Sequence, residues 1–313
     1  ITQGMDKDLW YQDISGIPEL PANDTNMNDQ VTFTEAPYLY RRQDADGNYF
    51  GDYYLFYATH WREEMGYARS TDITSNKWTH GGVIMEPTAT SDTNHPAIFN
   101  FQGHTYFIYH NGSLAAGMGQ RRVACVEELF FDEDGSIQYI QETSTCLTGI
   151  ASRIEDSDGV PIAHEQFHNS RDSGQYSVGG VGLNAKSVMM DASADKADRM
   201  WEIEPGKSDK ENEHYVSIES YNKPGTYLRA VKDGDGYKVT LEHDANGNRK
   251  ADSKGITTES DSMTFRTLKG FKGSGVTFES VAYPGYYLTS RDGALVLSDG
   301  TDAEACTFNV SND

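Results

Sequence analysis

The chain has 313 residues, with 26 lysines and arginines against 48 aspartates and glutamates, for a formal net charge of −22. This length favours two domains over one, because single cores rarely grow far beyond about 250 residues. The acidic excess argues against a nucleic-acid partner or an anionic membrane surface, since both would repel the chain. No stretch approaches the about 20 apolar residues of a membrane span, and the first ten residues lack the basic and apolar regions of a signal peptide.

The composition favours a β-rich protein that faces sugars. Aromatic residues make up 12% of the chain, with 19 tyrosines, and there are 30 glycines but few long apolar runs. The three cysteines, Cys125, Cys146 and Cys306, are too few for a disulfide framework. One disulfide with a free thiol and three buried thiols are both compatible with the sequence.

The first half of the chain is predicted to form short strands separated by turn sequences such as DADGN, FQGH and DEDGS. Only EEM at 63–65 and the stretch 191–199 give a weak helical signal. Strands at this spacing without helices indicate a sandwich, a barrel or a propeller. The expected strands are 31–41, 53–59, 65–70, 78–85, 96–101, 104–110 and 121–131.

The first of these strands, VTFTEAPYLYRR, carries a carboxylate followed closely by a proline. Proline cannot donate to a β-ladder, so Pro37 predicts a sheet edge or a strand end. Phe33, Tyr38 and Tyr40 surround Glu35 in the sequence, and burial among them would raise the pKa of Glu35 into the range of a proton donor. An exposed glutamate beside a turn explains the local sequence as well.

The composition becomes polar around 150–163, which predicts a boundary between domains at 1–152 and 160–313. Beyond it, residues 216–230 and 276–290 align with each other and share Glu-Ser, Pro-Gly and Tyr-Leu. The segments 263–268 and 306–311 close these two copies. A weaker first copy opens near 164–170 and closes at 199–206. Three copies of about 45–50 residues predict a β-trefoil, in which Pro-Gly forms a turn and Tyr-Leu packs in the core.

Other residues that could carry chemistry gather at 91–122. His95 precedes a proline, His104 and His110 follow at strand spacing, and Arg121 and Arg122 lie where one could bind a carboxylate. The sequence has no HExxH or paired CxxC pattern, and its Asp-rich loops lack EF-hand spacing. It also lacks a nucleophile elbow, a phosphate loop and a convincing dinucleotide fingerprint.

The order of these motifs over about residues 30–145 resembles glycoside hydrolase family 43, in particular its arabinofuranosidases and xylosidases. The resemblance implies the later blades of a five-bladed β-propeller that cleaves glycosidic bonds with inversion. It assigns the general acid to Glu35 and a substrate-facing arginine to Arg122, or to Arg121 by a one-residue slip. It places His95 where relatives often hold calcium or its waters, and aromatic residues such as Phe33 beside the sugar ring.

The repeats over about residues 163–313 resemble the arabinofuranose-binding β-trefoil module found beside such enzymes. The resemblance points to Tyr227, Tyr287 and Asp299 as sugar-binding residues. In that module a histidine follows the Tyr-Leu pair, but here Arg229 and Ala230, and Thr289 to Arg291, stand there. The candidates for a displaced histidine are His164, His168 and His243, with Asp302 as a second acid. The domain could instead brace the propeller.

A complete propeller of this family carries two more blades before the acid, with a general-base aspartate in an Asp-Pro setting. Only 34 residues precede Glu35, and the chain has no Asp-Pro. Inverting hydrolysis needs two carboxyl groups about 6.5–9.5 Å apart. We therefore expect the base to lie on blades outside this chain, which a second chain could supply.

Together these features predict an all-β protein with a partial five-bladed propeller followed by a β-trefoil. The expected function is an inverting glycoside hydrolase that releases arabinofuranose or xylose from arabinoxylan or arabinan. The substrate class predicts an extracellular location, and calcium is the expected ion, with no organic cofactor. The alternative is a non-catalytic carbohydrate-binding protein made of a propeller remnant and a lectin-like trefoil.

Overall fold

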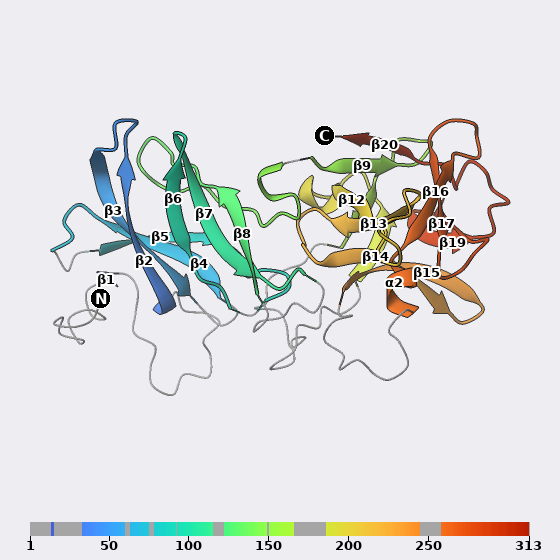
Figure 1. The fold of residues 1–313 in the computed structure, drawn as a ribbon, viewed down its shortest axis with the longest axis horizontal. Helices are drawn as coiled ribbons and strands as arrows, with labels where there is room; N and C mark the ends of the chain where they lie inside the picture. The colour runs from blue at the N-terminus through green and yellow to red at the C-terminus, as the bar shows by residue number, and fades with distance from the viewer. Residues whose placement is uncertain are drawn as a thin grey trace. The chain divides into compact units, whose positions relative to one another are not determined.

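Strands make up nearly all the regular structure in the computed structural model (Figure 1). The structure describes residues 14–15, 33–59, 63–74, 78–91, 93–114, 122–148, 150–165, 186–244 and 258–312. The chain forms two units. The first contains residues 1–111, 118–142 and 169–173, and the second contains 112–117, 143–168 and 174–313. The main division at 142–143 precedes the boundary expected from composition, so residues 143–152 lie in the second unit.

A five-stranded sheet in the order β1-β5-β4-β3-β2 begins the first unit. Strand β1 pairs with β5 in parallel, and the other neighbours are antiparallel. Strand β3 has its second half buried on both faces, since Tyr54 and Phe56 join one apolar cluster while Leu55 and Tyr57 join another. The strands are β1 (Ile14–Ser15), β2 (Phe33–Gln43), β3 (Tyr49–Thr59), β4 (Glu64–Ser70) and β5 (Trp78–Met85).

A three-stranded antiparallel sheet completes the described strands of the first unit, with β6 (Ala97–Phe101), β7 (His104–Asn111) and β8 (Val123–Glu128). Both sheets contribute to one core. Phe56 of β3 and Phe107 of β7 are fully buried, with their ring centroids 6.2 Å apart. The Tyr38 hydroxyl also donates to the Ile98 carbonyl at 2.8 Å. This packing fixes β2, which carries Glu35, against β6.

The second unit holds a 12-stranded sheet. Its short helical elements are η1 (Cys146–Thr148), η3 (Ala197–Arg199) and α2 (Thr258–Ser262). Its strands are β9 (Ser152–Glu155), β10 (Ile162–His164), β11 (Lys186–Met190), β12 (Trp201–Pro205), β13 (Tyr215–Ser220), β14 (Thr226–Asp233), β15 (Gly236–His243), β16 (Phe265–Lys269), β17 (Val276–Ser280), β18 (Tyr287–Arg291), β19 (Ala294–Ser298) and β20 (Asn309–Asn312).

The two strong sequence copies have the same local structure. Glu219 pairs with Tyr227, and Glu279 pairs with Tyr287 at the matching register. The corresponding Leu228 and Leu288 are fully buried. The segments that close the three copies likewise bury the matching aromatic residues, which are Trp201, Phe265 and Phe308. The sequence repeat therefore reflects equivalent buried positions in the copies, and these positions all belong to one apolar cluster.

The all-β prediction is confirmed, and each strand expected in the first half overlaps an observed one. The weak helical signal at 63–65 was wrong, because Glu64 and Met65 open strand β4. The stretch 191–199 contains only the short 3-10 helix η3. All three cysteines are free thiols. Within the described ranges, no helix is long and apolar enough to cross a membrane.

Candidate active site

Glu35 lies on β2, the edge strand of the five-stranded sheet. The register between β2 and β3 shifts on both sides of Glu35, and Ala36 takes a left-handed φ of 60°. Such a bulge re-aims a side chain and often borders an active site. The prediction of a sheet edge at Pro37 is confirmed. The alternative of a strand end is wrong, because the irregular strand continues to Gln43.

Three ionisable side chains meet at this bulge. One ligand-type atom each of Glu35, Glu63 and His95 lies within 4.8 Å of the other two. His95 Nε2 is 3.4 Å from Glu35 Oε1, and the Glu35 carboxyl also shares a hydrogen bond with Glu63. Glu35 and His95 are each about half exposed, with side-chain exposures of 50% and 49%, whereas Glu63 is 6% exposed. The cluster therefore opens to solvent through Glu35 and His95 and is anchored by Glu63.

Asn94 holds Glu63 and the backbone at His95 in place through hydrogen bonds. Its backbone N–H donates to Glu63 Oε2 at 2.5 Å. Its side-chain Oδ1 accepts from the backbone N–H groups of His95, at 2.9 Å, and His110, at 3.1 Å. Asn94 is fully buried. One residue thus sets both the position of the Glu63 carboxyl and the path of the chain that presents His95.

The two carboxyl groups of the cluster differ sharply in proton affinity. Burial raises the pKa of Glu63 to about 8, and the adjacent Glu35 adds to this shift. The hydrogen bond with Glu63 lowers the pKa of Glu35, and the nearby His95 and Arg122 act in the same direction. The sequence had suggested the opposite for Glu35. The difference arises because the Glu35 side chain is half exposed and has Glu63 as a partner, which the local sequence around Glu35 does not contain.

Arg122 gives this site a positive field. Its charge acts on Glu35, Glu63 and His110, and it lies just before β8. Burial, with the charges of Arg122 and His95, lowers the pKa of His110 to about 4, so this imidazole is neutral near pH 7. The structure thus places the predicted Glu35, His95 and Arg122 in one neighbourhood. Arg121 lies outside the described residues.

The ring of Phe33 packs against residues outside the cluster of Glu35, Glu63 and His95. Its ring lies 5.7 Å from that of Tyr57, and it packs against the cluster of Leu55, Tyr57 and Ala68. The bulge between Phe33 and Glu35 breaks the alternation that would place both side chains on one face. Its role beside a sugar stays a prediction.

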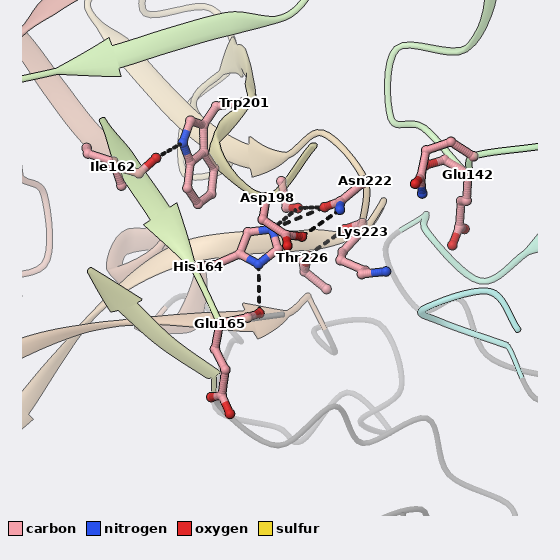
Figure 2. A network of polar contacts seen from close by, with 11 residues as sticks. Glu142, Ile162, His164, Glu165, Asp198, Trp201, Asn222, Lys223 and Thr226 are labelled. Carbon is pink, nitrogen blue, oxygen red and sulfur yellow. Dashed lines mark hydrogen bonds and ion pairs between the residues drawn. The ribbon is translucent and has the colours of Figure 1, made fainter. Parts of the chain in front are cut away.

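Two candidate histidines of the second unit, His164 and His243, are interior residues. His164 has no exposed side-chain surface, and its Nδ1–H donates to the Glu165 carbonyl at 2.9 Å (Figure 2). Its Nε2 lies 3.0 Å from the Ser220 hydroxyl, and Asn222 Nδ2 donates to Asp198 at 2.7 Å. Burial lowers the pKa of His164. His243 is likewise buried, and its Nδ1 lies 2.9 Å from the Gly225 carbonyl. His168 lies outside the described residues.

The other predicted sugar-binding residues have separate surroundings. Tyr227 is buried, with Lys207 Nζ 3.9 Å from its ring centroid. Tyr287 is half-buried against Phe271, with ring centroids 4.9 Å apart. Asp299 is exposed and accepts hydrogen bonds from Thr301 in a turn, which lower its pKa. Their part in sugar binding stays a prediction.

Two family models match the chain, one in its first half and one in the part that contains the sequence repeats. Residues 7–137 match the model of glycosyl hydrolases family 43, and residues 177–309 match the alpha-L-arabinofuranosidase B (ABFB) domain. Residues 7–137 are called the family 43 segment below, and residues 177–309 the ABFB domain, after the models that they match. The bulge with Glu35, the cluster at Glu63 and His95, and Arg122 all lie in the family 43 segment. The network around His164 and Asp198 overlaps the start of the ABFB domain.

Two curated relatives resemble part of the chain. An arabinoxylan arabinofuranohydrolase of Paenibacillus polymyxa is 31% identical over 150 residues, which cover 42% of this chain and 23% of that protein. A xylosidase/arabinosidase 43A of Humicola insolens is 32% identical over 107 residues, covering 34% of this chain and 29% of that protein. The chain thus spans less than a third of the length of either relative.

A solved structure also resembles this chain in part. It is a GH43 beta-xylosidase/alpha-arabinofuranosidase from a compost microbial metagenome, in complex with xylotriose and in a calcium-free form. It is 34% identical, the match covers 36% of this chain and 31% of that chain, and the TM-score is 0.31.

Among the described residues, the side chains that could hold a metal ion together are Glu35, Glu63 and His95. Calcium takes six to eight oxygen ligands, waters included, so the two carboxyl groups would supply part of its shell. His95 Nε2 lies 3.4 Å from Glu35 Oε1. The expected calcium ion near His95 stays a prediction.

Glu63 is the member of the site that sequence reasoning missed. It sits in WREEM, where two adjacent glutamates gave only a helical signal. A strand interpretation would have pointed to it, because β4 begins at Glu64 opposite Thr59 of β3, and Glu35 pairs with the neighbouring Ala58 of β3. A buried acid whose pKa is strongly raised beside a second charged group is a candidate functional residue.

Proposed function

We propose that the family 43 segment is part of a glycoside hydrolase that releases arabinofuranose or xylose from arabinoxylan or arabinan with inversion. Glu35 acts as the general acid and protonates the departing sugar oxygen. The observation that carries this assignment is the hydrogen-bonded Glu35–Glu63 pair at a solvent-open bulge, with Arg122 nearby. His95 orients the Glu35 carboxyl, and Arg122 contacts the substrate.

The general base is a different group from Glu63. An inverting enzyme needs about 6.5–9.5 Å between its two carboxyl groups, so that a water fits against the sugar. Glu63 is hydrogen-bonded to Glu35, which leaves no room for that water. We assign the base to an aspartate outside the described residues, on propeller blades of this protein or of a second chain.

The fold supports this proposal in outline. Strands β2–β5 and β6–β8 of the first unit are antiparallel meanders of the kind that form propeller blades, and we assign them to a five-bladed propeller. The three matching core positions of the ABFB domain, Trp201, Phe265 and Phe308, support a β-trefoil. This domain would hold the same polysaccharide or brace the propeller. A polysaccharide substrate places the protein outside the cell.

The test is release of arabinose or xylose from nitrophenyl glycosides and from arabinoxylan by the intact protein. General acid catalysis contributes about 10²–10⁴-fold, so Glu35→Gln should lose at least about 10²-fold of kcat on arabinoxylan. Glu128→Gln is the control, because Glu128 pairs with His104 outside the cluster, and it should keep full activity. Unchanged turnover in Glu35→Gln would exclude the assignment. Binding of arabinoxylan by the wild type without sugar release would favour a carbohydrate-binding protein.

A further inference from the structure

The sequence contains three Asn-x-Ser/Thr triplets, the acceptor pattern for N-linked glycans in secreted eukaryotic proteins. The first begins at Asn23, which lies outside the described residues. The other two begin at Asn111, the last residue of β7, and at Asn309, the first residue of β20. Because the triplet is a short and common pattern, the surroundings of each asparagine decide which one can carry a glycan.

Asn111 has no room for a glycan in the folded protein. It is fully buried, and its Nδ2 donates to Glu142 Oε1 at 2.8 Å. Glu142 is itself buried, and its Oε2 accepts the Ala89 backbone N–H at 2.9 Å. A sugar on Asn111 Nδ2 would displace this contact and take a donor away from a buried carboxyl group, which is costly.

Asn309 has the opposite surroundings. It is exposed, and so is Ser311, the third residue of its triplet. Phe308 before it is fully buried, and Val310 packs against the apolar cluster of the second unit. The alternation of side chains along a strand therefore turns Asn309 and Ser311 outward together. A glycan on Asn309 can leave the surface without moving a core residue.

The neighbouring strand β9 gives Asn309 a polar environment (Figure 1). Across the antiparallel ladder, Asn309 pairs with Glu155, and Ser311 pairs with Arg153. Directly opposed residues share one face of a sheet. Arg153 and Glu155 are partly exposed, and Arg153 Nη1 lies 3.3 Å from Glu155 Oε1. The hydroxyl and amide groups of a glycan can form hydrogen bonds with these charged side chains, and the glycan covers no apolar side chain of this strand pair.

We propose that Asn309, and not Asn111, carries an N-linked glycan when the protein is exported through a eukaryotic secretory pathway. This inference rests on the extracellular location in the proposed function. The donor is an oligosaccharide joined to a lipid through a diphosphate. Asn309 Nδ2 forms a bond to the anomeric carbon of the oligosaccharide, and the bond from that carbon to the diphosphate oxygen breaks. The lipid diphosphate is the leaving group, and Nδ2 gives up one proton.

The test is secretion of the whole chain from yeast and mapping of its glycans. Peptide mass spectrometry before and after digestion with peptide N-glycosidase should find a glycan on the Asn309 peptide and none on the Asn111 peptide. Ser311→Ala removes the acceptor pattern but keeps Asn309, so it should abolish the first glycan. Ser113→Ala, the matched change in the buried triplet, should leave the glycan on Asn309 unchanged. A secreted, folded protein without a glycan on Asn309, or with one on Asn111, would overturn the proposal.

The same preparations distinguish this inference from the proposed function. A protein that carries the glycan on Asn309 but releases no sugar from arabinoxylan would contradict the proposed function alone. A protein that releases sugar but has no glycan on Asn309 would contradict this inference alone. Because the glycan points away from the core, Ser311→Ala should also keep the sugar release of the wild type.

Discussion

At the residue scale, two glutamates of the ABFB domain occupy the same place in two copies of one motif but have different neighbours. Glu219 accepts the Gly225 N–H at 2.5 Å, and Glu279 accepts the Gly285 N–H at 2.9 Å. Across the strand pair, Glu279 faces Arg266 and forms an ion pair with it, whereas Glu219 faces Glu202. Burial, with the charge of Glu204 next, raises the pKa of Glu219 to about 8.

This contrast predicts a pH effect on the stability of the second unit. Because the folded state retains the Glu219 proton up to about pH 8, its stability should fall as pH rises from about 4.5 to 8 and level off above that. The contribution is at most about 1.4 kcal/mol per pH unit. Glu219→Gln stays neutral, so its melting temperature should exceed that of the wild type at pH 8 and match it at pH 4.5, as measured by calorimetry.

The second copy supplies the control for this prediction. Glu279→Gln removes the ion pair with Arg266, so it should lower the melting temperature at pH 8 instead of raising it. Equal effects of the two substitutions would show that the cross-strand partner does not decide the behaviour of the motif.

The candidate site shows what residue patterns can and cannot predict. Glu35 could be singled out as a candidate because its motif is local, with the acid and the proline two positions apart. Glu63 was missed because its place in the cluster depends on the packing of the strands and on Asn94, which is 31 positions away in sequence. The proton affinity of Glu35 was predicted in the wrong direction for the same reason, since it depends on a partner that the local sequence does not contain.

At the scale of the element, the bulge in β2 carries a measurable strain. Ala36 has a φ of 60°, and the left-handed region costs a residue with a Cβ roughly 1–2 kcal/mol. Glycine avoids this cost but loses roughly 0.5–1 kcal/mol of chain entropy. Ala36→Gly should therefore raise the free energy of unfolding by up to about 1 kcal/mol in urea denaturation.

A matched alanine in the same unit tests this explanation. Ala97 of β6 lies outside the positive-φ positions, so Ala97→Gly should lower the free energy of unfolding by roughly 0.5–1 kcal/mol. If Ala36→Gly were as destabilising as Ala97→Gly, Ala36 would not be strained. The bulge itself was not predicted, because the sequence shows where Pro37 interrupts the ladder but not how β3 compensates for it.

At the scale of the whole molecule, the described residues build separate cores. The apolar cluster around Leu228 and Leu288 lies in the second unit, whereas that around Phe56 and Ile84 lies in the first, and they share no residue. The strand-rich class and the repeats could be predicted because each core position recurs at a fixed spacing. The expected boundary came from the polar composition at 150–163, whereas the structural units depend on which strands pack together, and residues 143–152 belong to the second unit.

The shared core of the second unit makes a prediction about its copies. Leu228 and Leu288 are fully buried at equivalent positions, so Leu228→Ala and Leu288→Ala should each remove about 2–5 kcal/mol from the same unfolding transition. Ile84→Ala, in the core of the first unit, is the control and should shift a different transition in calorimetry. If Leu228→Ala and Leu288→Ala shifted two different unfolding transitions, the copies would fold independently of each other. One core built from all copies requires both substitutions to act on one transition.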